Sequence, residues 1–155
     1  MVPEDELNKR YKQALIIAVL MLVAIPIIFV ALAAFVQTEK IRPIPAEDSY
    51  KFMFYMIGLV AFVEPFVYLL VRRVQVGNFR KNTETKMTVG QFVLNQEITR
   101  FAFVSSIYVY GLITFFVGAD ATYMFYFYIY AIVWAVIYWP RYEKIKSLME
   151  SLEVS

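Results

Sequence analysis

Four long blocks of apolar residues alternate with shorter polar segments along this chain, at residues 14–36, 52–71, 101–117 and 121–139. Each block is close to the roughly 17 to 25 residues with which an α-helix crosses the hydrocarbon core of a bilayer. Hydrophobic residues make up 61% of the sequence, against roughly 45 to 50% in soluble domains. The pattern predicts an all-α fold, an integral membrane four-transmembrane-helix bundle with cytoplasmic helical extensions, formed as a single domain over residues 1–155.

Polar residues next to these blocks predict where two of the helices begin. Pro3 and the three acidic residues at 4–6 suit a first helical turn, because carboxylates complement the positive end of the helix dipole. Thr88 and Gln91 have the spacing of a capping box. This spacing predicts that the third helix begins near Val89, well before its apolar block, so that its first turns project beyond the membrane.

Other residues predict a kink, a loop and a short terminal helix. Pro26 lies near the middle of the first block, where a proline can kink a helix. Two arginines end the second block, and residues 75–86 have turn-forming residues and no hydrophobic period, which predicts a polar loop within the cytoplasmic segment 72–100. Beyond Pro140, apolar residues recur at helical spacing among charged ones, which predicts an amphipathic helix over residues 141–153.

The distribution of positive charge predicts the orientation of the bundle. Twelve of the fifteen lysines and arginines lie in the two terminal tails and in segment 72–100, whereas three lie in the first hairpin loop and none in the second. The positive-inside rule then places both termini in the cytoplasm, in a multi-pass protein of a prokaryotic inner (cytoplasmic) membrane. Four cations after the second block are expected to set this orientation and to contact anionic headgroups. They are Arg72, Arg73, Arg80 and Lys81.

The residue types that are missing limit the chemistry of the chain. It has no cysteine and no histidine, which are the usual ligands of haem, iron–sulfur clusters and transition-metal sites. A Gly-rich phosphate loop, a nucleophile elbow and a pair of intramembrane carboxylates are also missing from the sequence. We therefore expect no cofactor, no metal site and no enzymatic activity. The net charge of +2 is too small and too dispersed to predict nucleic-acid binding.

Glu64 is the only ionisable residue that lies inside an apolar block and away from its ends. A charged group at the centre of a bilayer costs about 2.5 to 3.5 kcal/mol, so such residues commonly mark functional sites. Its expected partners on the same helix are Tyr68, four residues on, and the carbonyl of Ala61, which Pro65 leaves without a backbone donor. Glu64 is then either a neutral, hydrogen-bonded residue at a proline kink or a site for a proton or cation.

Small and hydroxylated residues recur at helical spacing in the third and fourth blocks. Such residues let transmembrane helices approach closely and hydrogen-bond to one another. We expect them to pack the helices together. They are Ala102, Ser105, Ser106, Tyr110, Gly111, Thr114, Ala131 and Ala135.

One short segment carries a resemblance to a known family. Residues 100–112, RFAFVSSIYVYGL, resemble a helix of rotary-ATPase proteolipid subunits, in which small residues and an ion-carrying glutamate precede a Tyr-Gly-Leu sequence. Ser105 stands at the position of that glutamate, so the resemblance does not imply rotary ion transport. The end of the fourth block is similar to uncharacterised four-helix bacterial membrane proteins, in which an aromatic residue precedes Pro and Arg. The matching residues here are Trp139, Pro140 and Arg141.

These features favour a non-catalytic accessory or scaffolding subunit of a larger prokaryotic inner-membrane complex. Its partners would be larger membrane-protein subunits or further copies of the chain, together with lipids. The helical ends on the cytoplasmic side carry apolar faces that would either bind partners or pack on one another. These faces contain Leu7, Tyr11, Phe92, Val93, Ile145, Leu148 and Leu152.

Two other functions are compatible with the sequence. In the first, the chain forms a small oligomeric transporter or channel, in which Glu64, with Tyr68 beside it, binds a proton or a cation. In the second, the chain is a redox subunit with a quinone groove among the deep aromatic residues of the fourth block. Those residues are Phe127, Tyr128, Tyr130 and Trp134. The absence of cysteine and histidine makes the redox subunit the least favoured of the three.

Overall fold

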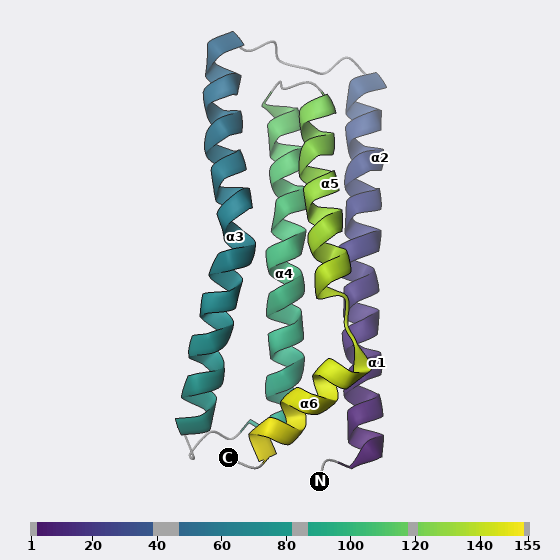
Figure 1. Ribbon diagram of the computed structural model, residues 1–155. Helices are drawn as coiled ribbons and strands as arrows, with labels where there is room; N and C mark the ends of the chain where they lie inside the picture. The colour runs from purple at the N-terminus through teal and green to yellow at the C-terminus, as the bar shows by residue number, and fades with distance from the viewer. Residues whose placement is uncertain (1–2, 39–46, 82–86, 118–120, 154–155) are drawn as a thin grey trace.

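The structure consists of long helical rods that lie side by side and one short helix that crosses one end of them (Figure 1). The computed structural model describes residues 3–38, 47–81, 87–117 and 121–153, and every element within these ranges is helical. The elements are α1 (Glu4–Val19), the π-helical segment η1 (Leu20–Ala24), α2 (Ile25–Thr38), α3 (Glu47–Lys81), α4 (Val89–Phe116), α5 (Ala121–Tyr138) and α6 (Tyr142–Glu153). Four helices are long and apolar enough to cross a membrane, with α1, η1 and α2 counted as one, as the hydrophobic blocks predicted.

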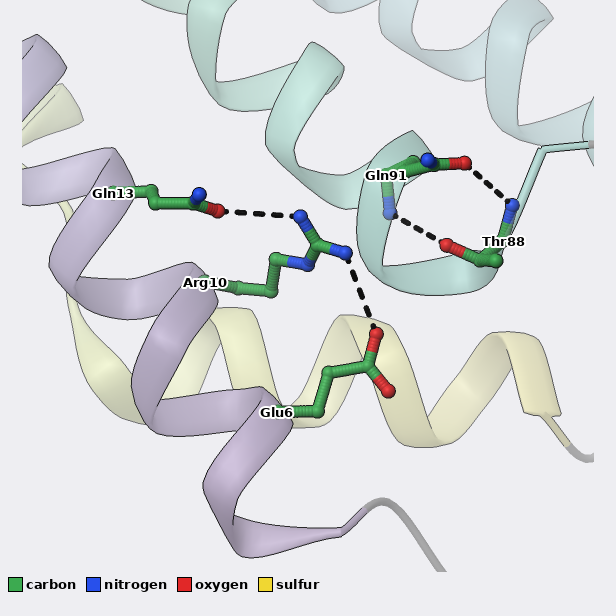
Figure 2. A network of polar contacts seen from close by, with 5 residues as sticks. All are labelled: Glu6, Arg10, Gln13, Thr88 and Gln91. Atoms are coloured by element: carbon green, nitrogen blue, oxygen red, sulfur yellow. Dashed lines mark hydrogen bonds and ion pairs between the residues drawn. The ribbon is translucent and has the colours of Figure 1, made fainter.

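Both predicted helix starts are confirmed, and they lie at the same end of the bundle, which we call the proximal end (Figure 1). α1 begins at Glu4 with three acidic residues in its first turn. α4 begins at Val89, and its capping box is complete: Thr88 Oγ1 accepts from the Gln91 backbone N–H at 3.2 Å, and the Thr88 N–H donates to Gln91 Oε1 at 3.1 Å (Figure 2). These bonds satisfy donors that a helix start otherwise leaves without partners.

The predicted polar loop over residues 75–86 is wrong where the structure describes that segment, because α3 continues through it as a helix. Phe79 of α3 stacks on Phe92 of α4 with ring centroids 4.1 Å apart. Gln96 of α4 donates through Nε2 to Gln75 Oε1 at 2.6 Å. Contacts with α4 therefore stabilise helical turns that show no hydrophobic period in the sequence, and the described part of segment 72–100 is made of the ends of two helices.

α4 is the central helix of the bundle, in contact with α1, η1, α2, α3, α5 and α6. Phe101 and Ile107 of α4 are fully buried. At Gly111 the helix lies very close to α5, because a Cβ atom there would lie 3.0 Å from Phe127 Cβ and 3.2 Å from the Met124 carbonyl oxygen. Such distances are too short for ordinary contacts, so the glycine allows the two helices to pack this closely.

The proximal end has a hydrophobic core of its own, separate from the core between the long rods. It joins the apolar faces of α1, α4 and α6, and its buried members are Leu7, Ala14, Phe92, Val93, Ile145, Met149 and Leu152. The sequence left open whether the apolar faces of these helical ends bind partners or pack together. In the structure they pack together. α6 confirms the predicted amphipathic helix, and it folds back onto α1 and α4.

Polar contacts lie beside this proximal core. Figure 2 shows the Arg10 side chain extending from α1 toward the first turn of α4. Its guanidinium pairs with Glu6 of α1 at 3.6 Å and donates to Oε1 of Gln13, also on α1, at 3.2 Å. The two helices approach so closely that a Cβ atom on Gly90 would lie 2.5 Å from Glu6 Oε1. α1 and α4 are thus packed side by side at the point where both leave the apolar part of the bundle.

Near Pro26 the first rod widens into the π-helical segment η1, at the place where the sequence predicted a kink. In η1 the Ile25 N–H bonds the carbonyl of Leu20, five residues back. The same pattern would pair the next carbonyl, that of Met21, with the N–H of residue 26, which proline lacks. Ser105 of α4 replaces that donor, because its Oγ donates to the Met21 carbonyl oxygen at 3.0 Å.

Candidate functional site

Glu64 lies half-buried on α3, beside α4. Its carboxyl group is hydrogen-bonded to the hydroxyls of Ser106 and Tyr110, which both belong to α4. The second carboxyl oxygen, Oε2, is buried and has no hydrogen-bond partner among the described residues. One half of the carboxyl group is therefore paired across the α3–α4 contact, and the other half remains available to a further donor.

The Glu64 side chain lines a groove of about 460 Å³ between α3 and α4, together with Phe103 and Tyr110. The remaining lining residues are aliphatic and belong to α3. They are Leu59, Val60, Val63 and Val67, and each of them is between 39% and 59% exposed. With that much exposure the groove opens on the flank of the bundle. We call it the flank groove.

The sequence predicted that Glu64 would bond Tyr68 and the carbonyl of Ala61. In the structure its partners are instead the two hydroxyls of α4. Tyr68 is buried, and its ring packs edge-on against Tyr138 of α5 with centroids 5.4 Å apart. The Tyr138 hydroxyl donates to the carbonyl oxygen of Pro65 at 3.3 Å. Helical spacing along α3 could not identify the true partners, because they belong to α4.

The residues predicted to pack the third and fourth helices occupy three kinds of position. The buried ones are Ser105, Gly111, Thr114, Ala131 and Ala135. Ser106 and Tyr110 are half-buried and bond Glu64, whereas Ala102 is exposed. Thr114 donates to the Tyr110 carbonyl of its own helix. The small-residue pattern therefore includes both helix-packing positions and the hydroxyls that reach the carboxyl group.

The deep aromatic residues of α5 pack against other rings. Phe127 and Tyr128 are buried in the main core. Tyr130 stacks on Phe62 of α3 with centroids 6.1 Å apart, and its hydroxyl donates to the Phe62 carbonyl oxygen at 3.1 Å. Trp134 packs edge-on against Phe66 with centroids 5.7 Å apart. The aromatic residues that could have lined a quinone groove therefore join α5 to α3 and to the core.

A second cavity, of about 480 Å³, lies at the proximal end between α3, α4, α5 and α6. We call it the proximal cavity. Its charged lining residues are Arg72, Glu97, Arg100, Glu143 and Lys144. Arg72 is the only one of the four predicted headgroup-contacting cations in this lining, since Arg73, Arg80 and Lys81 are exposed elsewhere on the proximal part of α3.

Arg100 is the most constrained of these charged residues. Its guanidinium pairs with Glu97 one turn earlier, and both side chains are only 7% exposed. The guanidinium also lies 5.2 Å from the ring centroid of Phe101 and 5.9 Å from that of Tyr138. Its Nε remains buried without an acceptor among the described residues. The spacing of Glu97 and Arg100 on one helix face was a signal in the sequence, but their burial depends on α5 and α6.

The other cations of the proximal cavity lack such a counter-charge. Within the described ranges, Arg72 and Lys144 form no ion pair. Burial lowers the pKa of the Lys144 ammonium group, and the neighbouring cations Arg141, Arg100 and Arg72 lower it further. Three cations therefore face two carboxylates in one cavity, and the excess is positive.

These two places differ in what they can do chemically. The flank groove offers one carboxyl group and two hydroxyls in apolar surroundings, and the proximal cavity offers cations. Among the described residues, no group of three or more acidic, histidine or cysteine side chains is arranged to hold a metal ion. No protein-family model, curated protein or solved structure matches this chain.

Proposed function

We propose that this chain is a multi-pass protein of a prokaryotic inner membrane, with both termini in the cytoplasm, and that it serves as a non-catalytic accessory or scaffolding subunit. The length and apolar character of four helices support the membrane location. The excess of lysine and arginine in the segments at the proximal end supports the orientation. On the proposed topology, α6 and the capped start of α4 lie at the cytoplasmic border.

The observation that carries the proposal is the unpaired oxygen of Glu64 in the flank groove. An unsatisfied polar group is costly in lipid, and hydrogen bonds between helices are one of the forces that join membrane subunits. A partner helix with a hydroxyl or amide group would satisfy Oε2 and cover the exposed aliphatic residues beside it. The apolar faces at the proximal end are already used within the chain, which favours contact with the partner inside the membrane.

Ser106 ties this carboxyl group to the backbone of α4. Its hydroxyl donates to the Phe103 carbonyl oxygen at 2.7 Å and is also hydrogen-bonded to Glu64. The carboxyl group is thereby held at the contact between α3 and α4, with Oε2 left for a partner.

The absence of cysteine from the natural sequence allows a site-specific test. Single-cysteine variants at Val60 and Val63 place a cross-linker in the flank groove, and variants at Ile132 and Val136 place it on a face of α5 that is at least as exposed. Cross-linking in native membranes should give one defined adduct with a larger subunit from the α3 positions only. Adducts of equal yield from both faces, or a chain that purifies alone in mild detergent, would contradict the proposal.

The second candidate is a proton- or cation-coupled transporter or channel that uses Glu64. It is favoured by the presence of two hydroxyls on one intramembrane carboxyl group. Glu64→Gln separates the candidates, because glutamine keeps a donor and an acceptor but cannot release a proton. An accessory subunit should keep its partner in this variant, whereas a transporter should lose flux in liposomes. A wild-type chain that shows no flux removes the transporter.

A further inference from the structure

We propose that the proximal cavity binds the phosphate group of an anionic phospholipid, held by Arg72 of α3 and Lys144 of α6. The two residues are far apart in sequence and come together because α6 folds back against the end of the bundle (Figure 1). This site shares the membrane location with the proposed function, but it requires no partner subunit.

The charges inside the cavity call for an anion. Glu97 compensates Arg100, whereas Arg72 and Lys144 have no ion pair within the part of the chain that the structure describes. The lowered pKa of Lys144 reflects the partial loss of solvent around its ammonium group and repulsion from nearby cations, and an anion placed among them would relieve that repulsion. Basic pockets between transmembrane helices at the cytoplasmic side are typical sites for phospholipid headgroups.

Arg100 provides an independent observation. The side chain is more than nine-tenths buried, it lines the cavity, and its Nε–H has no acceptor among the described residues. Buried donors without acceptors are rare, because an unpaired one costs about 1 to 3 kcal/mol or more for a charged group. A phosphate oxygen within the cavity would be a strong acceptor for it.

The walls of the cavity favour a lipid over a free phosphate ion. Leu69 of α3 and Ile137 of α5 form part of the lining and are 46% and 45% exposed on the flank of the bundle. Ser147 and Ser151 of α6 line the polar side. A phospholipid with its phosphate between the cations would extend its acyl chains past the apolar pair and direct its headgroup toward the serines. The volume of about 480 Å³ lies within the range of ligand pockets.

The test measures lipid binding to the purified full-length chain by native mass spectrometry, with phosphatidylglycerol as the probe and phosphatidylcholine as the zwitterionic reference. Phosphatidylglycerol should bind in preference, and Arg72→Gln and Lys144→Gln should each weaken it about fivefold, the effect of one basic residue at an anionic surface. Arg73→Gln is the matched control, because it removes the same charge from the neighbouring exposed position outside the cavity.

Three results would overturn the proposal. Equal weakening by Arg73→Gln and Arg72→Gln would mean that lipids are attracted to the surface of α3 in general. Equal binding of phosphatidylcholine would mean that the cavity does not recognise anionic lipids. Displacement of phosphatidylglycerol by inorganic phosphate at comparable concentration would mean that the occupant is a free phosphate ion. Because Arg72 and Lys144 are exposed, their variants should fold, and the cross-linking pattern of the flank groove should not change.

Discussion

α4 and α3 are both long enough to cross a membrane, but they are buried to very different extents. In the most apolar stretch of each helix, 56% of the residues of α4 are buried, against 17% for α3. α4 contacts every other helix, whereas α3 contacts mainly α4. The polar residues differ as well: Ser105 of α4 has a partner within the chain, while Glu64 of α3 keeps an unpaired oxygen. α4 therefore holds the fold together, whereas most of the apolar surface of α3 is left exposed on the flank of the bundle.

The largest effect is expected from the buried charge pair on α4. Glu97→Ala leaves Arg100 buried without its counter-charge, which should lower the free energy of unfolding by about 3 kcal/mol. Chemical unfolding of the purified protein in detergent measures the change. Glu143→Ala is the control, since it removes a carboxylate from the exposed rim of the same cavity and should have little effect. Equal effects of the two variants would show that the Glu97 pair contributes no more than a surface charge.

A pair of glycines tests the difference between α4 and α3 most directly. Gly111→Val adds a side chain whose first atom, Cβ, would lie only 3.0 Å from Phe127 Cβ, and should destabilise the fold by about 2 kcal/mol. Gly58→Val on α3 introduces the same side chain where nothing lies within 4 Å of the Cβ position. It should therefore leave the free energy of unfolding nearly unchanged or raise it slightly. If the two variants unfold alike, the close packing of α4 against α5 does not determine stability.

Removal of the Ser105 hydroxyl, which donates to a carbonyl of η1, should have a smaller effect on stability. Ser105→Ala leaves the Met21 carbonyl without its donor, at a cost of about 1 kcal/mol. Ser151→Ala should cost less, because the Ser151 hydroxyl is exposed and bonds only the Leu148 carbonyl of its own helix. Unfolding curves of the two variants measured in the same detergent provide the comparison. A Ser105→Ala variant as stable as the wild type would mean that another donor, such as water, reaches Met21.

The smallest effect concerns the pH dependence of stability. Because the pKa of Lys144 in the folded chain lies below the ordinary value of 10.5, the charged lysine disfavours folding. Stability should then rise as the pH increases from the folded-state pKa toward the ordinary value of 10.5. The thermal midpoint measured over this range should rise less in Lys144→Gln and in Arg72→Gln. The charged groups that face Lys144 are Arg72, Glu97, Arg100, Arg141 and Glu143. Identical slopes in all three proteins would contradict this.

Features that depend on neighbouring residues in the chain could be predicted from the sequence. The Thr88 capping box is formed by residues three positions apart, and the apolar period of α6 is visible in its own sequence. The helical end of α3 was missed because it depends on contacts with Phe92 and Gln96 of α4. A single hydrophobic pattern contains no information about contacts between segments that are distant in the chain.

The candidate sites follow the same rule. Glu64 could be recognised from its type and its place in an apolar block, whereas its true partners, Ser106 and Tyr110, required the packing of α3 on α4. The proximal cavity was missed because Arg72 and Lys144 are separated by nearly half of the chain. The sequence therefore identified one member of each site and could not supply the others.

The central place of α4 has a consequence for the order in which the molecule assembles. A ribosome makes α1, α2 and α3 before α4. Apart from the contacts of α1 and α2 with the adjoining η1, each of these three helices packs mainly against α4, and α3 has little contact with α1 or α2. Until translation has passed Ser105 and Tyr110, the Met21 carbonyl lacks its donor and Glu64 lacks its hydroxyl partners. In the proposed membrane location, the earlier helices would therefore remain separate, with these polar groups unpaired, until α4 is inserted. For this chain, tertiary folding is expected to start late in synthesis and then to proceed on all sides of one newly inserted helix.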